Sequence, residues 1–392
     1  MSDDRDYPET VAGPFETPTV RFEDREGREV EIRSYDGNGA DAAVEALAAA
    51  ERPVVVAGNG VHASGAHDTL RTVAEEYGAA VVTSYLGQST IPETHPLAAG
   101  VIGSFGPAGA NQLVSEADVL LVVGSRLNPM DTNWQAPGFI RPDEQTILHA
   151  DIDSRNAGWV YPADVGLVGD AAATLSVLAE RTPADVDGEW ARERAARARE
   201  SFHAPACESD AVPVKPQRAV AEIDRVVDEE TVVTADSGNN RFWLLQYLQT
   251  PGTRTYFGSG GVGAMGWAVP AGVAAALATD RSAVAVAGDG GFTMTMTSLE
   301  TAVEHGLGVT VVVLNDTSLG MVRQMQDDDE ISGVEFHDTD FVQAAEAFGA
   351  VGHRVQASTD LAAALDTATA ATDRPHVIDT RIDREEEMSE QL

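Results

Sequence analysis

Cysteine and lysine are almost absent from this sequence, and their scarcity excludes several classes of site. The only cysteine, Cys207, leaves no partner for an internal disulfide and too few thiols for a cysteine-rich zinc site or an iron–sulfur cluster. It lies in an apparent linker, which argues against a catalytic thiol. The only lysine, Lys215, stands in Val-Lys-Pro without a preceding glycine-rich loop, which excludes a P-loop and argues against a Schiff-base enzyme.

Long apolar runs and basic charge are also scarce. The sequence has no stretch of roughly 18 apolar residues and no signal peptide at its start, and it contains neither GxSxG nor HExxH. We therefore expect a soluble, cytoplasmic protein. The 392 residues carry 63 acidic and 26 basic side chains, and this net charge of −37 argues against nucleic acid and anionic membranes as partners.

The negative charge is spread along the whole chain, which bears on the environment of the protein. Self-repulsion at this charge destabilises a compact chain unless salt screens it, and the Debye length falls to about 3 Å near 1 M salt. An intracellular protein of a high-salt organism is our main interpretation. An unusually acidic mesophilic protein is the alternative.

Apolar β-type runs alternate with helical stretches, which predicts an α/β fold of two doubly wound parallel-sheet domains. We expect an irregular N-terminal segment (1–35), a central domain (36–182), a linker (183–212), a C-terminal domain (213–385) and an acidic tail (386–392). The predicted strands are Val54–Ala57, Ala80–Thr83, Val119–Val123, Thr146–Ala150, Thr231–Ala235, Ala283–Ala287, Val309–Leu314, Val351–Val355 and His376–Thr380.

Two glycine clusters imitate dinucleotide-binding fingerprints. Gly58-Asn-Gly60-Val-His-Ala63 follows a strand and opens a helix, whereas Gly258-Ser-Gly260-Gly261-Val-Gly263 follows a short Thr-Tyr-Phe run. The strand after the first cluster lacks the acidic residue that would hold a ribose hydroxyl. Each cluster is compatible with a NAD site or with a tight turn that lets a strand and a helix pack closely.

Two aspartates follow successive strands of the second domain. Strand Ala283–Ala287 leads into Gly288-Asp289-Gly290-Gly291, and after a helical crossover strand Val309–Leu314 leads into Asn315-Asp316. Such a crossover makes the strands parallel, so both aspartates emerge at one edge of the sheet, and neighbouring strands about 4.8 Å apart would let them share a cation. The flanking glycines and the helix start after Asp316 suit Mg²⁺ that holds a diphosphate. The alternative is that both aspartates only cap helices.

These motifs resemble the thiamine diphosphate motif, usually written GDG with a following NN or ND. The surrounding sequence, from roughly residue 40 to 385, is most similar to acetolactate synthase large subunits and to pyruvate oxidases. The likeness includes Ser259–Pro270, Gly320–Gln326 and Ala150–Asp153. The likeness identifies the cofactor specifically, but it identifies the substrate only weakly.

The resemblance implies a role for each matching residue. Mg²⁺ would be held by the side chains of Asp289 and Asp316 and by the Ser318 carbonyl, and Met265 would enforce the bent shape of the cofactor, although from the residues alone it would be core filler. Thiamine diphosphate would be bound by Ser237, Gly238, Asn239, Asn240, Gly263, Met265, Gly288, Asp289, Gly290, Gly291, Asn315, Asp316, Ser318, Leu319, Gly320 and Met321.

Departures from the family pattern concern the activating glutamate, the acceptor and FAD. The family's pyrimidine-binding domain supplies that glutamate, and residues 1–35 are too short to form it. We therefore expect another chain of a homo- or hetero-oligomer to supply it, or this chain to be a truncated or split form, and we assign no catalytic glutamate. Met325 stands where acetolactate synthases carry an acceptor-pocket tryptophan, which leaves the acceptor substrate open. Gly124–Met130 lacks the acidic pair of the FAD-contacting stretch, which weakens the inference of FAD, although FAD stays a possible cofactor.

The activity that the resemblance implies is decarboxylation of a 2-keto acid such as pyruvate, followed by carboligation to a second keto acid. A 2-keto acid decarboxylase and a pyruvate oxidase-type subunit are neighbouring alternatives. A non-catalytic remnant that binds thiamine diphosphate and a NAD-dependent dehydrogenase are alternatives of other classes.

Overall fold

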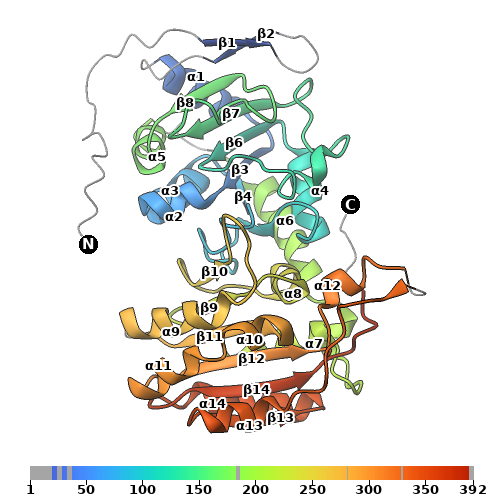
Figure 1. The fold of residues 1–392 in the computed structure, drawn as a ribbon. Helices are drawn as coiled ribbons and strands as arrows, with labels where there is room; N and C mark the ends of the chain where they lie inside the picture. Colours follow the sequence, from blue (N-terminus) through green and yellow to red (C-terminus); the bar gives the residue numbers. More distant parts are fainter. Residues whose placement is uncertain are drawn as a thin grey trace.

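The computed structural model describes residues 20–23, 29–32, 38–181, 186–279, 281–327 and 330–387. Two six-stranded parallel sheets, each with helices on both faces, lie one above the other in Figure 1. This arrangement confirms the predicted fold class, an α/β protein with two doubly wound domains.

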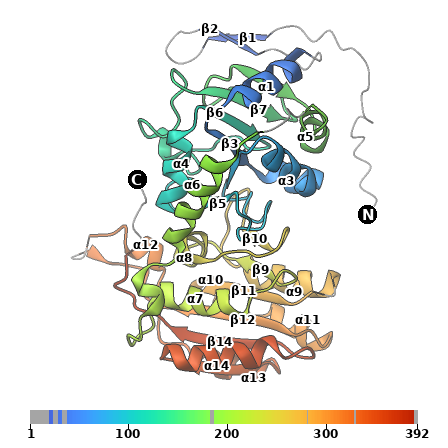
Figure 2. The same ribbon diagram turned by 180° about the vertical axis from the view of Figure 1, so that it is seen from behind.

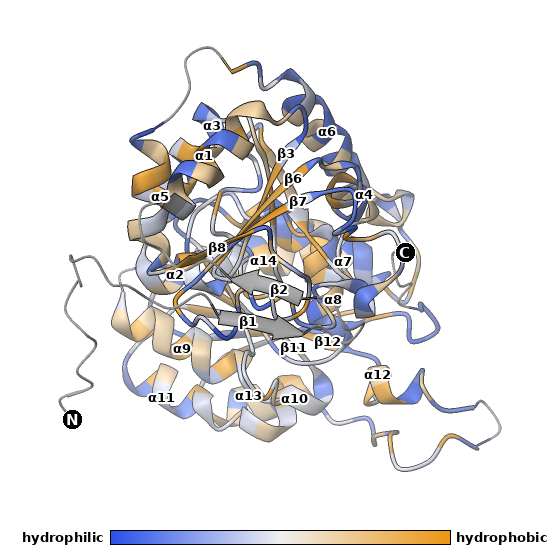
Figure 3. Cartoon of the chain, turned by 90° about the horizontal axis from the view of Figure 1, so that it is seen from above, coloured by the Kyte–Doolittle hydropathy of each residue, from blue (hydrophilic) through white to orange (hydrophobic). Residues whose placement is uncertain are grey.

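The sheet of the central domain has the strand order β5-β4-β3-β6-β7-β8, and all of its strands are parallel. Its middle strands are rich in valine and fully buried, because helices cover both faces of the sheet. Figure 3 shows β3, β6 and β7 as hydrophobic arrows enclosed by helices with hydrophilic outer faces. The strands are β3 (Pro53–Ala57), β4 (Ala80–Thr83), β5 (Ala98–Val101), β6 (Val119–Val123), β7 (Thr146–Asp151) and β8 (Val165–Val168).

The helices of the central domain form two layers. Helices α1, α2, α3 and α5 pack together on one side of the sheet, and α4 packs with α6 on the other (Figure 2). Helix α6 falls within the segment assigned as the linker, and its Ala191, Ala195 and Ala198 are buried in the core of the central domain. The helices are α1 (Asn38–Ala49), α2 (Asn59–Ser64), α3 (His67–Glu76), α4 (Ala108–Glu116), α5 (Ala171–Ala179) and α6 (Glu189–Arg199).

An antiparallel pair of short strands, β1 (Val20–Glu23) and β2 (Glu29–Ile32), precedes the central domain. The pair differs from the irregular segment predicted for residues 1–35. The sequence signal for it is an alternation of apolar and charged residues, Val-Arg-Phe-Glu and Glu-Val-Glu-Ile, which has the period of a strand.

The sheet of the C-terminal domain has the order β10-β9-β11-β12-β14-β13 and is also parallel throughout. Alternate residues of β11 face two separate apolar clusters, with Val284 and Val286 on one side and Ala283, Ala285 and Ala287 on the other. The strands are β9 (Val232–Ala235), β10 (Tyr256–Gly258), β11 (Ala283–Gly288), β12 (Val309–Asn315), β13 (Val351–Val355) and β14 (His376–Arg381).

Helices α7, α8 and α14 cover one face of this sheet, and α9, α11 and α13 cover the other. The alanine face of β11 lets α9 approach closely, since a Cβ on Gly272 of α9 would lie 3.0 Å from the Ala285 Cβ. The helices are α7 (Pro216–Val226), α8 (Asn239–Tyr247), α9 (Ala268–Ala278), α10 (Asp289–Thr295), α11 (Ser298–Glu304), α12 (Gly320–Arg323), α13 (Phe341–Ala347) and α14 (Ser358–Thr369).

A buried carboxyl group joins the two domains. The Glu93 Oε2 atom accepts hydrogen bonds from the Thr250 amide and hydroxyl, both 2.8 Å long, and the Glu93 amide donates to the Thr250 carbonyl over 2.8 Å. Burial raises the pKa of Glu93 to about 7, although the hydrogen bonds from Thr250 and Gln88 act in the opposite direction. Nearby, the rings of Phe105 and Phe242 stack with their centroids 3.8 Å apart. The domains are thus held by specific contacts as well as by the connecting chain.

In the part of the chain that the structure describes, no helix is long and apolar enough to cross a membrane.

Candidate cofactor and metal site

A cavity of about 390 Å³ lies at the carboxyl ends of β9, β11 and β12, the edge where doubly wound sheets bind ligands. Its size falls within the range of about 300–1,000 Å³ that is typical of small-molecule sites. All but one of the predicted cofactor-binding residues line it. These are Ser237, Gly238, Asn239, Asn240, Gly263, Met265, Gly288, Asp289, Gly290, Gly291, Asp316, Ser318, Leu319, Gly320 and Met321.

Asp289 and Asp316 reach the cavity from adjacent parallel strands. Gly288 of β11 and Leu314 of β12 are partners in the register, so Asp289, directly after Gly288, and Asp316, two residues after Leu314, leave the sheet at the same edge. Burial, and after it the charge of Asp316, raises the pKa of Asp289 to about 7. Burial also raises the pKa of Asp316. A buried and a half-buried carboxylate that repel each other form a place where a cation would be strongly stabilised.

The backbone after β12 turns sharply at Thr317. This residue has a φ of 58°, a left-handed conformation that is rare for a β-branched side chain. The turn is held by the Thr317 amide, which donates to the Asn315 Oδ1 atom over 3.1 Å, and by the Ser318 amide, which donates to the Asp316 Oδ1 atom over 3.0 Å. Strain of this kind is characteristic of ligand-binding positions, because the surrounding structure must maintain it.

A residue that sequence analysis did not single out, Asp236, fixes the opposite wall. Its fully buried carboxylate accepts hydrogen bonds from the amides of Ser237, Gly266 and Trp267, at 2.8, 2.9 and 3.1 Å. It thereby fixes two backbone segments of this wall, the one at Ser237 and the one at Gly266 and Trp267, directly after Met265. A Cβ on Gly291 would lie 2.3 Å from the Asp236 Oδ2 atom, so only glycine fits at that position. The sequence signal for Asp236 is its position directly after strand β9.

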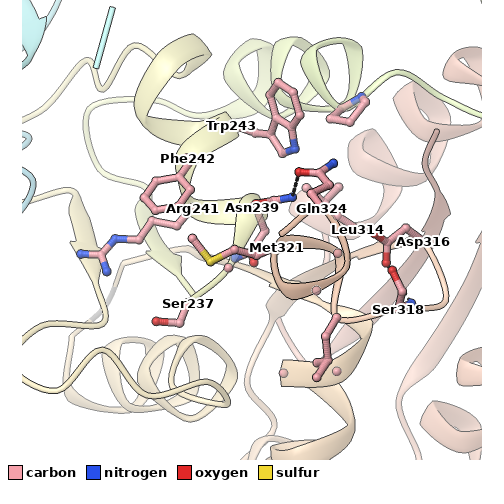
Figure 4. Close-up of a pocket in the computed structure, with 18 of the residues that line it drawn as sticks. Ser237, Asn239, Arg241, Phe242, Trp243, Leu314, Asp316, Ser318, Met321 and Gln324 are labelled. Atoms are coloured by element: carbon pink, nitrogen blue, oxygen red, sulfur yellow. Dashed lines mark hydrogen bonds between the residues drawn. The ribbon is translucent and has the colours of Figure 1, made fainter. Parts of the chain in front are cut away.

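The start of α8 presents backbone amides and short polar side chains to the cavity. Gly238, with a φ of 122°, precedes the helix, and the Ser237 hydroxyl donates to the Gly263 carbonyl. Figure 4 shows Ser237 and Asn239 among the lining side chains, with the Asn239 Nδ2 atom donating to the Gln324 Oε1 atom over 2.9 Å. The Asn240 side chain instead donates to the Asp236 carbonyl over 3.0 Å, so it braces the turn.

Asn315 is the one predicted cofactor-binding residue that the structure places away from this cavity. Successive side chains of β12 point to opposite faces, and Leu314 lines the cavity while Asn315 does not. The Asn315 amide donates to the Asp379 Oδ1 atom over 2.7 Å on the neighbouring strand. Its role in the structure is therefore to support the turn that carries Asp316.

Several lining residues lie outside the predicted set. Tyr85 and Met130 come from the central domain, whereas Phe242 and Trp243 from α8 and Glu386 from the C-terminal segment also line the cavity. Figure 4 shows Phe242, Trp243 and Met321 as large apolar groups around the pocket. Long-range packing brings these residues together, and no local motif announces them.

The chemistry of the lining fits a divalent cation and a diphosphate. In the described residues no three His, Cys, Asp or Glu side chains gather as a metal site, so a cation here would rest on two carboxylates and main-chain oxygen, a ligand set suited to Mg²⁺. A Cβ on Gly290 would lie 2.8 Å from Leu319 and 3.2 Å from the Met265 methyl carbon. The glycine therefore lets the Leu319 and Met265 side chains pack closely against the backbone of this turn.

The first glycine cluster serves the packing of the central domain. The Gly58 amide donates to the Val123 carbonyl over 2.8 Å and the Gly60 amide to the Gly124 carbonyl over 3.0 Å. A Cβ on Gly60 would lie 2.6 Å from the Gly124 Cα atom. These amides are already occupied by backbone carbonyls, which favours the close-packing interpretation of the cluster over a phosphate-binding one.

Comparison with known proteins identifies both domains. Residues 40–178 match the family described as thiamine pyrophosphate enzyme, central domain, and residues 236–380 match the thiamine pyrophosphate enzyme, C-terminal TPP binding domain. The chain belongs to the thiamine pyrophosphate enzyme family. Most of the residues that line the cavity described above lie in the second of these domains.

Similar proteins within the family include acetolactate synthase large subunits. The chain is 31% identical to the probable acetolactate synthase large subunit of Methanococcus aeolicus over 87% of this chain and 60% of that protein. It is 33% identical to the corresponding protein of Methanocaldococcus jannaschii, over 87% of this chain and 59% of that one. With the acetolactate synthase isozyme 3 large subunit of Escherichia coli the identity is 32%, over 83% and 58%. The chain therefore spans about 60% of the length of these members of the thiamine pyrophosphate enzyme family.

Proposed function

We propose that this chain binds thiamine diphosphate and Mg²⁺ in the cavity of its C-terminal domain and belongs to an enzyme that decarboxylates a 2-keto acid such as pyruvate and joins the product to a second keto acid. The observation that carries the proposal is the paired aspartates at the ends of adjacent parallel strands, in a cavity that is also lined by several glycines. The names of the relatives support the acetolactate synthase-like reaction.

Each wall of the cavity would contribute a different function. Asp289, Asp316 and the Ser318 carbonyl would hold the cation, which in turn would neutralise the diphosphate. Amides at the start of α8 would donate to the diphosphate oxygens, as helix N-termini favour anions. Met265 would lie under the middle of the cofactor. The two residues that follow it, Gly266 and Trp267, hold its position because their amides donate to the Asp236 carboxylate. When bound, thiamine diphosphate supplies a carbon nucleophile and an electron sink for decarboxylation.

Large apolar side chains would exclude water from the reacting centre. Phe242, Trp243 and Met321 lie around the pocket, and Tyr85 and Met130 approach from the central domain. A water-poor site strengthens the electrostatic interactions within it and protects reactive species from protonation by solvent. FAD is not part of the proposal, because Gly124–Met130 lacks the acidic pair and the nearby glycine amides are engaged by backbone.

The glutamate that activates the cofactor would come from a pyrimidine-binding domain on another chain. Among the described residues that line the cavity the only glutamate is Glu386, and hydrogen bonds from Lys215 and Gln217 occupy its carboxylate. The proposal therefore includes a homo- or hetero-oligomer in which the site is completed by a partner, with 2-keto acids as the substrates.

Calorimetric titration of thiamine diphosphate into the purified chain, with and without Mg²⁺, tests the proposal. We expect binding that requires Mg²⁺ and disappears in Asp289→Ala, because the cation loses one of its two carboxylates. Asp366→Ala is the matched control, since this exposed aspartate of the same domain pairs with Arg225 on the surface. Binding that is equal with and without Mg²⁺, or equal in both variants, would contradict the assignment of the site.

A parallel assay of pyruvate consumption separates binding from turnover. Metal-dependent binding without turnover supports a site that a partner chain completes. Turnover by the purified chain would show that no chain of a different kind is needed.

A further inference from the structure

The C-terminal segment Ile382–Glu386 forms a thin wall of the cofactor cavity. Ile382, Asp383, Arg384 and Glu386 line that cavity, and the first three also line a second cavity of about 450 Å³. Asp316 lines both cavities as well. The segment thus separates the cofactor site from a second hollow, so its position controls how enclosed the cofactor site is.

The backbone of this wall is fastened at one end to the first residues of the C-terminal domain. Val214 and Ile382 form a parallel bridge, in which the Val214 amide donates to the Arg381 carbonyl over 3.0 Å. The Asp383 amide donates to the Val214 carbonyl over 2.9 Å. After Asp383, side chains carry most of the attachment.

Lys215, the only lysine of the chain, supplies the central attachment. Its Nζ atom donates to the Asp383 Oδ2 atom over 2.7 Å and to the Glu386 Oε2 atom over 2.6 Å. The second Glu386 oxygen, Oε1, accepts from the Gln217 Nε2 atom over 2.6 Å. These hydrogen bonds raise the pKa of Lys215, and the one to Asp383 lowers the pKa of that carboxyl.

The wall is linked in turn to the predicted diphosphate-binding residues. The Gln324 Nε2 atom donates to the Glu386 carbonyl over 3.0 Å, while the Gln324 Oε1 atom accepts from the Asn239 Nδ2 atom over 2.9 Å (Figure 4). A continuous path of polar contacts therefore leads from Lys215 through Glu386 and Gln324 to Asn239, at the start of α8.

We propose that Lys215 is a positioning residue that holds segment Ile382–Glu386 across the cofactor cavity and, through Gln324, keeps Asn239 in place for the anionic part of the ligand. The identity of that ligand rests on the proposed function, whereas the attachment of the segment does not. A lysine suits this role because its compact ammonium group has three donors and can serve two carboxylates at once. Without it, two uncompensated carboxylates would repel each other and an approaching diphosphate.

The test compares Lys215→Met with Lys215→Arg, which keeps the charge, and with Arg71→Met. Arg71 pairs with Asp68 on the surface of the central domain, so its loss changes the net charge equally at a distant place. Hydrogen exchange of the amides of residues 383–386 is measured first, without cofactor or Mg²⁺. Calorimetry with thiamine diphosphate and Mg²⁺ follows under the same salt conditions.

We expect Lys215→Met to accelerate exchange at residues 383–386 and to weaken thiamine diphosphate binding about tenfold, since two partly exposed ion pairs are lost. Lys215→Arg should restore most of both properties, and Arg71→Met should change neither. Unchanged exchange at residues 383–386 in Lys215→Met would overturn the proposed attachment. Faster exchange with unchanged affinity would overturn its link to the ligand.

Failure of the proposed function gives a different pattern. If the unmodified chain binds no thiamine diphosphate, that function falls, while the exchange measurement still decides whether Lys215 holds the segment. If Lys215→Met does not fold, Glu386→Ala carries the same comparison, because it removes both side-chain acceptor oxygens at this position and keeps the lysine. Exchange that stays unchanged in Glu386→Ala would overturn the attachment in that case.

Discussion

Replacing Glu93 by glutamine is expected to stabilise the chain above neutral pH and to leave it nearly unchanged in acid. The folded structure raises the pKa of this buried carboxyl from 4.5 to about 7. The stability associated with the carboxyl is therefore fully present below about pH 4.5 and is lost as the pH rises through 7. At 1.36 kcal/mol per pH unit, the ionised form costs about 3 kcal/mol at pH 8, and the glutamine avoids this cost.

The surroundings of Glu93 can accept the amide. The Thr250 amide and hydroxyl can still donate to the remaining carbonyl oxygen, as they now do to Oε2. The Gln88 Nε2 atom donates to Glu93, while the buried Gln88 Oε1 atom has no hydrogen-bond partner among the described residues. A flip of the Gln88 amide would therefore provide an acceptor for the new NH₂ group.

Denaturant unfolding between pH 5 and 8, at constant salt and without ligand, measures the difference between Glu93→Gln and the unmodified chain at each pH. We expect less than about 1 kcal/mol at pH 5 and up to about 3 kcal/mol in favour of the variant at pH 8. Glu93→Ala is the control, because it also cannot ionise but loses the hydrogen bonds to Thr250, so it should be less stable than Glu93→Gln at every pH. A Glu93→Gln variant that is less stable at pH 8, or equally shifted at both pH values, would refute the reasoning.

Two further predictions concern the cavity and the charge of the chain. In Gly291→Ala the new methyl group would meet the Asp236 Oδ2 atom at 2.3 Å. We therefore expect a loss of about 1–3 kcal/mol in unfolding free energy, measured by denaturant unfolding. We also expect at least about tenfold weaker thiamine diphosphate binding, measured by calorimetry. Dialysis from about 2 M to about 0.1 M salt is expected to unfold or inactivate the chain, because a net charge of −37 is then poorly screened, and circular dichroism that stays constant would contradict this.

Much of the site could be predicted because it depends on local order along strands. Asp289 and Asp316 each follow a buried apolar strand, and parallel strands place such residues at one edge. The same alternation that buries β12 also turns Asn315 away from Leu314, so its position outside the cavity was accessible to strand periodicity. The likeness of the motif outweighed that signal.

The remainder could not be predicted because it arises from packing between distant segments. Tyr85 and Met130 enter the cavity only through the docking of the central domain, which Glu93 and the Phe105–Phe242 stack maintain. Strands β5 and β8 escaped prediction because Ala-Ala-Gly-Val and Val-Gly-Leu-Val are short and weakened by glycine. Neither sequence has the run of β-branched residues that identifies β3 or β6.

The presence of Tyr85 and Met130 in the lining has a consequence for the modularity of this protein. Exchange of the C-terminal domain alone for that of a relative would transplant the aspartates but would leave two contacts of the pocket from the original chain. The complete pocket should therefore be transferred only when both domains are exchanged together. Recombination or engineering should treat the two domains as one unit, which includes the hydrogen-bonded contact between Glu93 and Thr250.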